Sequence, residues 1–322
     1  MRDSTTMTAN RSVSSEALLH ELLPTVERSL DRHVNAATEW FPHEFVPYEE
    51  GRNFIAEPWK PADSHLPDVA QMALEVNLLT EDNLPYYHLA IWRTFGEDDV
   101  WGEWVRRWTA EEGRHAILLR DYLTVTRGVD PEKLEQGRMD MVLRGWTPQF
   151  ARQGPLDGVL FTTLQELATR LSHRNTGAIT EDETARRVCA RVATDENLHY
   201  VFYRDLAAHA IAVDPSDAML ALKRQVVGFA MPGADMPGFR DKAKAMARAG
   251  IYNVRIHLEQ VLRPVLETHW KIGELDGLSD EAKQAREDVY AHLARLERIA
   301  HKLGEPLGPV TGDLSNDPVG IP

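Results

Sequence analysis

Two short motifs in the chain pair a glutamate with a histidine three residues later: Glu112 with His115, and Glu196 with His199. On a helix, residues three positions apart lie on one face about a turn from each other. A carboxylate oxygen and an imidazole nitrogen on that face can bind one metal ion together. One such motif is weak evidence, because glutamate and histidine are common on helix surfaces.

Each motif is preceded by a further glutamate at nearly the same spacing. Glu81 stands 31 residues before Glu112, and Glu166 stands 30 residues before Glu196. Two such halves, paired about a pseudo-two-fold axis, provide the four carboxylates and two imidazoles of di-iron and di-manganese bundles. Burying so many polar groups is costly unless cations share them. The repeat therefore predicts a dinuclear metal site formed by Glu81, Glu112, His115, Glu166, Glu196 and His199.

The elements that position these residues are predicted to be helices. Apolar residues recur at helical spacing, and alternating runs of β-branched residues are absent. Thr180 and Glu183 are placed as a capping box that opens one helix, and Pro85 is expected to kink another. We predict helices over about residues 15–33, 67–95, 98–126, 131–143, 156–174, 181–212, 215–230, 237–249, 255–272 and 279–303.

This pattern predicts an all-α fold, with a ferritin-like di-metal four-helix bundle core and additional helices. Residues 15–303 are expected to form a single helical domain, in which residues 40–66 are irregular and rich in proline and aromatic residues. A disordered N-terminus over 1–14 and a disordered, proline- and glycine-rich tail over 304–322 are expected to flank it.

Composition excludes several classes of protein. Hydrophobic residues make up 43% of the 322 residues, as in globular chains. The net charge of −14 argues against a nucleic-acid partner. Cys189 is the single cysteine, which excludes an internal disulfide and a cysteine-based metal site and favours a cytoplasmic protein. No apolar stretch approaches the ~20 residues of a membrane span, and the start of the chain lacks a secretory signal.

Several blocks resemble the soluble acyl-(acyl-carrier-protein) desaturases, including the plant stearoyl enzyme and, more closely, actinobacterial members. The resemblance covers about residues 18–303. It rests on WFPHEFVPY (40–48), TEDNLP (80–85), WTAEEGRH (108–115), LQELATRLSHRNTG (164–177) and DENLH (195–199). It implies one iron bound by Glu81, Glu112 and His115 and a second by Glu166, Glu196 and His199, with Glu112 and Glu196 as bridges.

The resemblance also implies roles for residues around the metals. Thr169 matches the family's threonine near the oxygen-binding face. Trp40, His173 and Asp195 match a proposed electron-entry relay. Asp195 directly precedes a ligand, and a carboxylate there can orient a ligand histidine.

One position departs from the plant pattern. The chain has Glu81 followed by Asp82 where the plant enzymes have two glutamates. We therefore expect Glu81 to be the ligand and Asp82 to point away from the metals.

The implied reaction forms a cis double bond in a carrier-bound fatty acyl chain, with two Fe ions as cofactor and O2 as co-substrate. Side chains alone cannot take hydrogen from an unactivated C–H bond, so the cofactor must supply that chemistry. The sequence contains no flavin fingerprint and no cysteine cluster, so ferredoxin or a similar donor must supply electrons. The other implied partners are the acyl carrier protein and a second copy in a homodimer.

The substrate and carrier sites are less defined by the sequence. A narrow apolar tunnel past the metals is expected, with Tyr87, Ala90, Ile91, Val159 and Phe161 as candidate walls. Because the carrier and this chain are both acidic, a local basic patch is needed for docking. The candidate patch consists of Arg240, Lys242, Lys244 and Arg248, although a solvated helix face explains the same pattern.

Other di-metal classes fit less well. A ribonucleotide reductase radical subunit normally has a tyrosine four residues after the first ligand histidine, where this chain has Leu119. Ferritin-like iron storage uses a much shorter chain assembled into a cage. An oxidase acting on a different substrate and a non-catalytic metal-binding paralogue stay open as alternatives.

Overall fold

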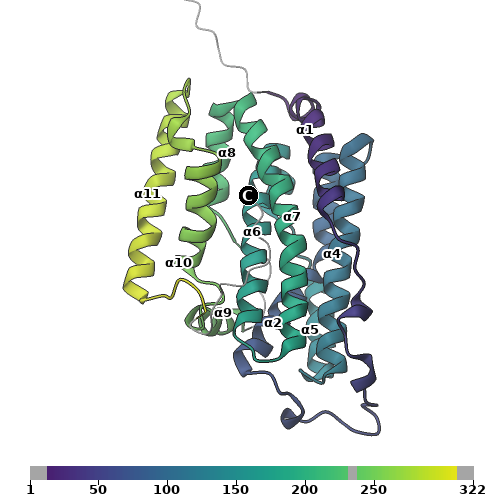
Figure 1. Cartoon of the computed structure of the whole chain (residues 1–322). Helices are drawn as coiled ribbons and strands as arrows, with labels where there is room; N and C mark the ends of the chain where they lie inside the picture. Colours follow the sequence, from purple (N-terminus) through teal and green to yellow (C-terminus); the bar gives the residue numbers. More distant parts are fainter. Residues whose placement is uncertain (1–12, 231–237, 310–322) are drawn as a thin grey trace, which may run out of the picture.

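The computed structural model describes residues 13–230 and 238–309, and within these ranges the regular elements are all helices (Figure 1). The predicted all-α fold is confirmed. Five long helices dominate it: α1 (Ser15–Ala36), α4 (Asp99–Val125), α6 (Pro155–Ala178), α7 (Glu183–Val213) and α11 (Asp280–Leu303). The shorter ones are α2 (Asp68–Glu81), α3 (Leu84–Phe95), α5 (Pro131–Arg144), α8 (Pro215–Val227), α9 (Phe239–Arg248) and α10 (Val254–Ile256).

The helices α6 and α7 run side by side through the middle of the molecule (Figure 1). On one side, α1 packs on α7, and α4 packs on α2 and α3. On the other side, α8 contacts both α6 and α11. Among the described residues no helix is both long and apolar enough to cross a bilayer.

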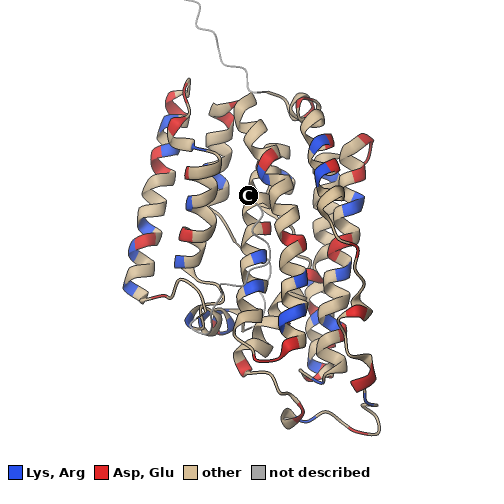
Figure 2. Cartoon of the chain, viewed as in Figure 1, with Lys and Arg blue, Asp and Glu red and all other residues tan. Residues whose placement is uncertain are grey.

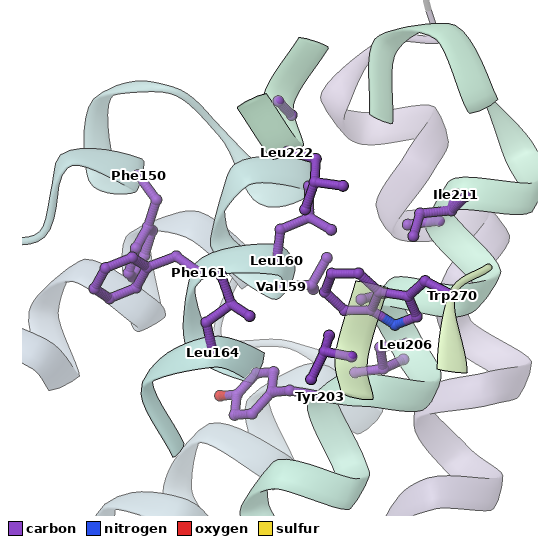
Figure 3. Packing of buried hydrophobic residues seen from close by; sticks show 14 of the residues in the cluster. Phe150, Val159, Leu160, Phe161, Leu164, Tyr203, Leu206, Ile211, Leu222 and Trp270 are labelled. Atoms are coloured by element: carbon purple, nitrogen blue, oxygen red, sulfur yellow. The ribbon is translucent and has the colours of Figure 1, made fainter. Parts of the chain in front are cut away.

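The main hydrophobic core lies where α6, α7 and α8 meet (Figure 3). Leu160 and Leu164 of α6, Leu206 of α7 and Leu222 of α8 are almost fully buried there, and Trp270 closes the cluster. Burying each such side chain stabilises the fold by roughly 1.5–3 kcal/mol. This packing holds α6 and α7 together, and both helices carry residues of the predicted metal site.

Two predicted helix boundaries need correction. The kink expected at Pro85 is a break at Asp82 and Asn83, and Pro85 lies in the first turn of α3. Proline suits that place because its missing N–H is not needed in a first turn. The cap of α7 is Asp182 and not Thr180, because the Asp182 side chain accepts a hydrogen bond from the backbone of Ala185.

The helix predicted over 255–272 is more irregular than expected. After α10 it continues as two π-helical segments, His257–Leu262 and Pro264–His269. It ends at His269, with Trp270 as its cap, rather than at residue 272, and Lys271 adopts a left-handed conformation with φ of 46°.

The ends of the chain also differ from the prediction in their described parts. Residues 304–309, predicted to be disordered, lie against the molecule. The Asn253 side chain donates a hydrogen bond to the Pro306 carbonyl oxygen, and the Gln260 side chain donates one to the Leu307 carbonyl oxygen. At the other end Ser14 caps α1. Residues 1–12 and 310–322 lie outside the described ranges.

Candidate metal centre

Four helices contribute the six predicted ligands, and all six side chains are buried. Glu81 ends α2, Glu166 lies on α6, Glu112 and His115 lie on α4, and Glu196 and His199 lie on α7; their exposed fractions run from 0% to 7%. These six side chains form two groups whose possible ligand atoms lie within 4.8 Å of one another. These groups are Glu81, Glu112, His115 and Glu196, and Glu112, Glu166, Glu196 and His199.

Glu112 and Glu196 belong to both groups. The Nδ1 atom of His199 lies 2.9 Å from Oε1 of Glu112 and 3.9 Å from Oε2 of Glu196. The Nδ1 atom of His115 lies 3.6 Å from Oε2 of Glu112 and 3.5 Å from Oε1 of Glu196. Both histidines therefore direct Nδ1 toward the two shared carboxylates.

The inward atoms lack the hydrogen bonds that buried polar atoms normally have. Oε1 of Glu112, both carboxylate oxygens of Glu196, and Nδ1 of His115 and of His199 are buried without a hydrogen-bond partner. Carboxylate and imidazole are the donor set of di-iron and di-manganese bundles. The unsatisfied atoms and the donor set together fit a pair of cations.

Burial opposes the charge in this cluster. It raises the pKa of Glu81 and of Glu166 well above the usual range, and the charge of Glu196 raises both further. Burial also acts to raise the pKa of Glu196, but the nearby imidazoles of His115 and His199 lower it well below its usual value. Bound cations would neutralise these neighbouring carboxylates and so offset the free-energy cost of burying their charge.

Asp195, Trp40 and His115 form one connected chain outside the ligands. The indole Nε1 of Trp40 donates to Oδ2 of Asp195 at 2.8 Å, and the same oxygen lies 3.4 Å from Nε2 of His115. Trp40 also stacks on the His115 ring, with centroids 6.4 Å apart. Asp195 therefore contacts His115 and not His199 through a hydrogen bond.

His173, predicted to share that chain, lies elsewhere. Its Nε2 is 3.1 Å from Oε1 of Glu81, and its Nδ1 is 3.3 Å from the Asn77 side-chain nitrogen. Burial lowers the pKa of His173 to about 4. The neutral ring can donate to Glu81 and accept from Asn77, so it holds Glu81 in place.

Thr169 lies beside the buried cluster, and Asp82 lies outside it. Thr169 lines a small cavity beside Glu81, Glu112 and Glu196, and its hydroxyl donates to the carbonyl of the residue four positions before it. Asp82 turns away from the cluster and accepts a hydrogen bond of 2.9 Å from Arg138.

The sequence reasoning missed Glu111. Its Oε2 lies 2.9 Å from Nε2 of His199 and 2.9 Å from Nε2 of His33, and all three residues are buried. A signal was available, because Glu111 directly precedes Glu112 as Asp195 directly precedes Glu196.

A second, larger cavity of about 90 Å³ lies next to the small one. Val76 and Thr80 of α2, Thr169 of α6, and Phe239 and Met246 of α9 contribute to its walls. Thr80 and Thr169 line both cavities.

Of the predicted tunnel walls, Tyr87 lines the small cavity beside the carboxylates. The other four are buried in the main hydrophobic core and line neither of these two cavities: Ala90, Ile91, Val159 and Phe161.

Comparison with known proteins identifies the class of this fold. Residues 14–307 match the family model described as fatty acid desaturase. The chain belongs to the fatty acid desaturase family. This match extends across almost all of the helical bundle.

Individual relatives agree with the family. A candidate acyl-(acyl-carrier-protein) desaturase from Mycobacterium tuberculosis, DesA1, is 45% identical over 294 residues, covering 88% of this chain and 87% of DesA1. The chloroplastic stearoyl-(acyl-carrier-protein) 9-desaturase of Gossypium hirsutum is 27% identical over 285 residues, covering 83% of this chain and 71% of its own. The X-ray structure of a candidate acyl-ACP desaturase, DesA2 of Mycobacterium tuberculosis H37Rv, matches with a TM-score of 0.67 at 30% identity, over 84% of this chain and 99% of its own.

Proposed function

We propose that this desaturase removes two hydrogens from a fatty acyl chain bound to an acyl carrier protein and so forms a cis double bond. The observation that carries the proposal is the buried cluster in which Glu112 and Glu196 are shared between two ligand groups. The names of the relatives support a carrier-bound acyl substrate.

The six ligands are assigned to two iron ions. Glu81 and His115 face one position, Glu166 and His199 face the other, and Glu112 and Glu196 serve both. When bound, the iron pair together with O2 supplies the oxidising power that no side chain has. The protein holds the carboxylates in place, and the surrounding helices exclude water from the reacting carbons.

The acyl chain is proposed to approach through the cavity between α2, α6 and α9. Its apolar walls suit methylene groups, and Thr80 and Thr169 connect it to the cavity beside the carboxylates. A chain that extends from there into the smaller cavity would pass Glu81 and Glu112, which line that cavity.

The basic face of α9 is proposed to contact the carrier. In Figure 2 the ribbon of α9 carries several Lys and Arg positions, coloured blue, and Arg240, Lys244 and Arg248 are exposed there. Lys244 pairs with Asp241 at 3.1 Å, and Lys242 pairs with Glu75 at 3.1 Å, so part of the charge is balanced locally. Because α9 also lines the larger cavity, a carrier docked on it would deliver its acyl group at the mouth.

Electrons are proposed to come from ferredoxin or a similar donor and to enter near Trp40. Trp40 is buried directly before the partly exposed residues 41–45. The contacts from Trp40 to Asp195 and from Asp195 to His115, of 2.8 and 3.4 Å, connect that segment to a proposed ligand. A homodimer and a cytoplasmic location complete the proposal.

The test uses the full chain, reduced anaerobically with added iron. Stearoyl carrier protein, ferredoxin and its reductase, and O2 are then added, and the acyl product is analysed by mass spectrometry. We expect an O2-dependent loss of two hydrogens, which Glu112→Ala abolishes and Glu103→Ala, an exposed change on the same helix, preserves. Iron binding without any change in a panel of acyl carriers would overturn the desaturase assignment and leave a metal-binding paralogue. An oxygenated product would indicate a different oxidase.

A further inference from the structure

The two ligand histidines have matching surroundings on the side away from the metal site. Nε2 of His115 faces Asp195, and Nε2 of His199 faces Glu111 at 2.9 Å. Each of these outer carboxylates directly precedes a shared ligand, and Arg114 lies within 3.9 Å of both. The two halves of the site are therefore built alike as far as the outer carboxylates.

The next residue outward differs between the halves. Asp195 accepts from the indole of Trp40, whereas Oε2 of Glu111 lies 2.9 Å from Nε2 of His33, near the end of α1. His33 is 3% exposed, and its ring lies parallel to the His199 ring with centroids 5.7 Å apart. The Nδ1 atom of His33 has no hydrogen-bond partner, so burying this ring costs free energy. Helix packing alone does not explain why a histidine stands here.

Glu111 is suited to accept from both imidazoles. Its Oε2 lies 2.9 Å from Nε2 of each ring, and a carboxylate oxygen accepts hydrogen bonds. The Nε2 atoms of both rings therefore carry the protons that they donate. Arg107 occupies the other oxygen, Oε1, of the same carboxylate.

We propose that His33 is a positioning residue for the metal site, which holds Glu111 so that His199 keeps its proton on Nε2 and presents Nδ1 to the metals. The proposal rests on the metal site of the proposed function. The protonated nitrogen of a ligand histidine is set by the hydrogen bond that it donates, and loss of such an outer partner commonly costs 10- to 100-fold in metal affinity.

Substitutions at His33 separate this role from simple packing. His33→Phe keeps a ring of similar size and removes the donor, whereas His33→Gln keeps a side-chain N–H. His20→Gln, an exposed change on the same helix, is the control. Each full-length variant, freed of metal, is titrated with Co²⁺, which reports on its ligands through its visible absorption bands, and thermal unfolding is followed in parallel.

We expect wild type and His20→Gln to bind two Co²⁺ ions per chain. In His33→Phe one ion should bind about tenfold more weakly, with altered absorption bands, and His33→Gln should restore most of the affinity. Glu111→Gln should weaken the same ion, and adding His33→Phe to it should have little further effect, because both changes break one chain of contacts.

Two results would overturn the positioning role. The first is a His33→Phe protein that binds both ions with wild-type affinity and bands. The second is an equal loss in His33→Phe and His33→Gln together with additive effects of the two substitutions, which would mean that His33 acts only through packing. If wild type itself bound no cobalt, the metal site of the proposed function would fail, and the two failures are distinguishable.

Discussion

Glu81 and His173 meet between α2 and α6, with Oε1 of the carboxylate 3.1 Å from Nε2 of the imidazole. The other oxygen of Glu81 faces the buried carboxylate–histidine cluster, 3.9 Å from Nδ1 of His115. One oxygen of Glu81 therefore contacts a histidine outside the cluster, and the other oxygen faces into the cluster. The orientation of Glu81 depends on a histidine that is itself held by Asn77.

Removing that histidine should weaken metal binding. His173→Ala frees Glu81 to rotate, and we expect about a tenfold loss of affinity for one of two Co²⁺ ions. His173→Gln, which retains a donor, should lose less. Isothermal titration calorimetry of metal-free protein measures both. Equal, unchanged affinities in the two variants would show that Glu81 is held by α2 alone.

Glu166→Gln should separate stability from metal binding. Burial and the neighbouring Glu196 raise the pKa of Glu166, so this carboxyl group destabilises the metal-free protein when it is charged. The amide keeps an oxygen to accept from Trp108 Nε1, which lies 3.2 Å from Oε1. We expect the free energy of unfolding in EDTA to rise by about 1 kcal/mol, while stabilisation by added Co²⁺ falls. Urea unfolding with and without metal tests this, and a less stable metal-free variant would contradict it.

Reversing charge on α9 should weaken carrier binding. Arg240→Glu and Arg248→Glu each change the net charge by two on the exposed face, and we expect each to lower affinity for an acidic acyl carrier protein about fivefold at low salt. The salt dependence of binding should decrease as well. Lys283→Glu, in the first turn of α11, makes the same change of charge elsewhere. If Lys283→Glu weakens binding as much as the α9 variants do, net charge and not the α9 surface governs docking.

His257 should make stability depend on pH. Burial lowers its pKa to about 4, and the nearby His292 contributes in the same direction. Because the folded-state pKa lies below the unfolded value of 6.5, protons bind preferentially to the unfolded chain, and stability is lost as the pH falls from about 6.5 to about 4. The loss at pH 5 relative to pH 7 should be about 2 kcal/mol.

Urea unfolding of wild type and His257→Gln at these two pH values isolates the contribution of His257 from that of the carboxylates. The glutamine side chain can keep a contact with the Tyr252 hydroxyl, which lies 2.8 Å from Nδ1 of His257. Between pH 7 and pH 5, wild type should lose about 2 kcal/mol more of its free energy of unfolding than His257→Gln does. An identical pH response in both would refute the prediction.

The sequence alone was sufficient to predict the helical class and the clustering of six carboxylate and imidazole side chains. The reason is that helical periodicity fixes a face, and the repeated spacing of Glu81 to Glu112 and of Glu166 to Glu196 requires two matching hairpins. Local rules did less well at boundaries. Thr180 and Asp182 are both suitable N-cap residues, and the backbone conformation of one turn decides between them. A proline such as Pro85 is compatible with a kink inside one helix or with the first turn of a new helix.

Only the tertiary structure decided which side chains support the ligands. His33 and Trp40 lie seven residues apart in the chain, yet they reach opposite outer carboxylates because α1 ends between α4 and α7. The same holds for His173, which the fold places against Glu81 rather than Asp195. Periodicity specifies the direction in which a residue points from its own helix, but the partner it meets depends on how separate helices pack, and that information is not local in the sequence.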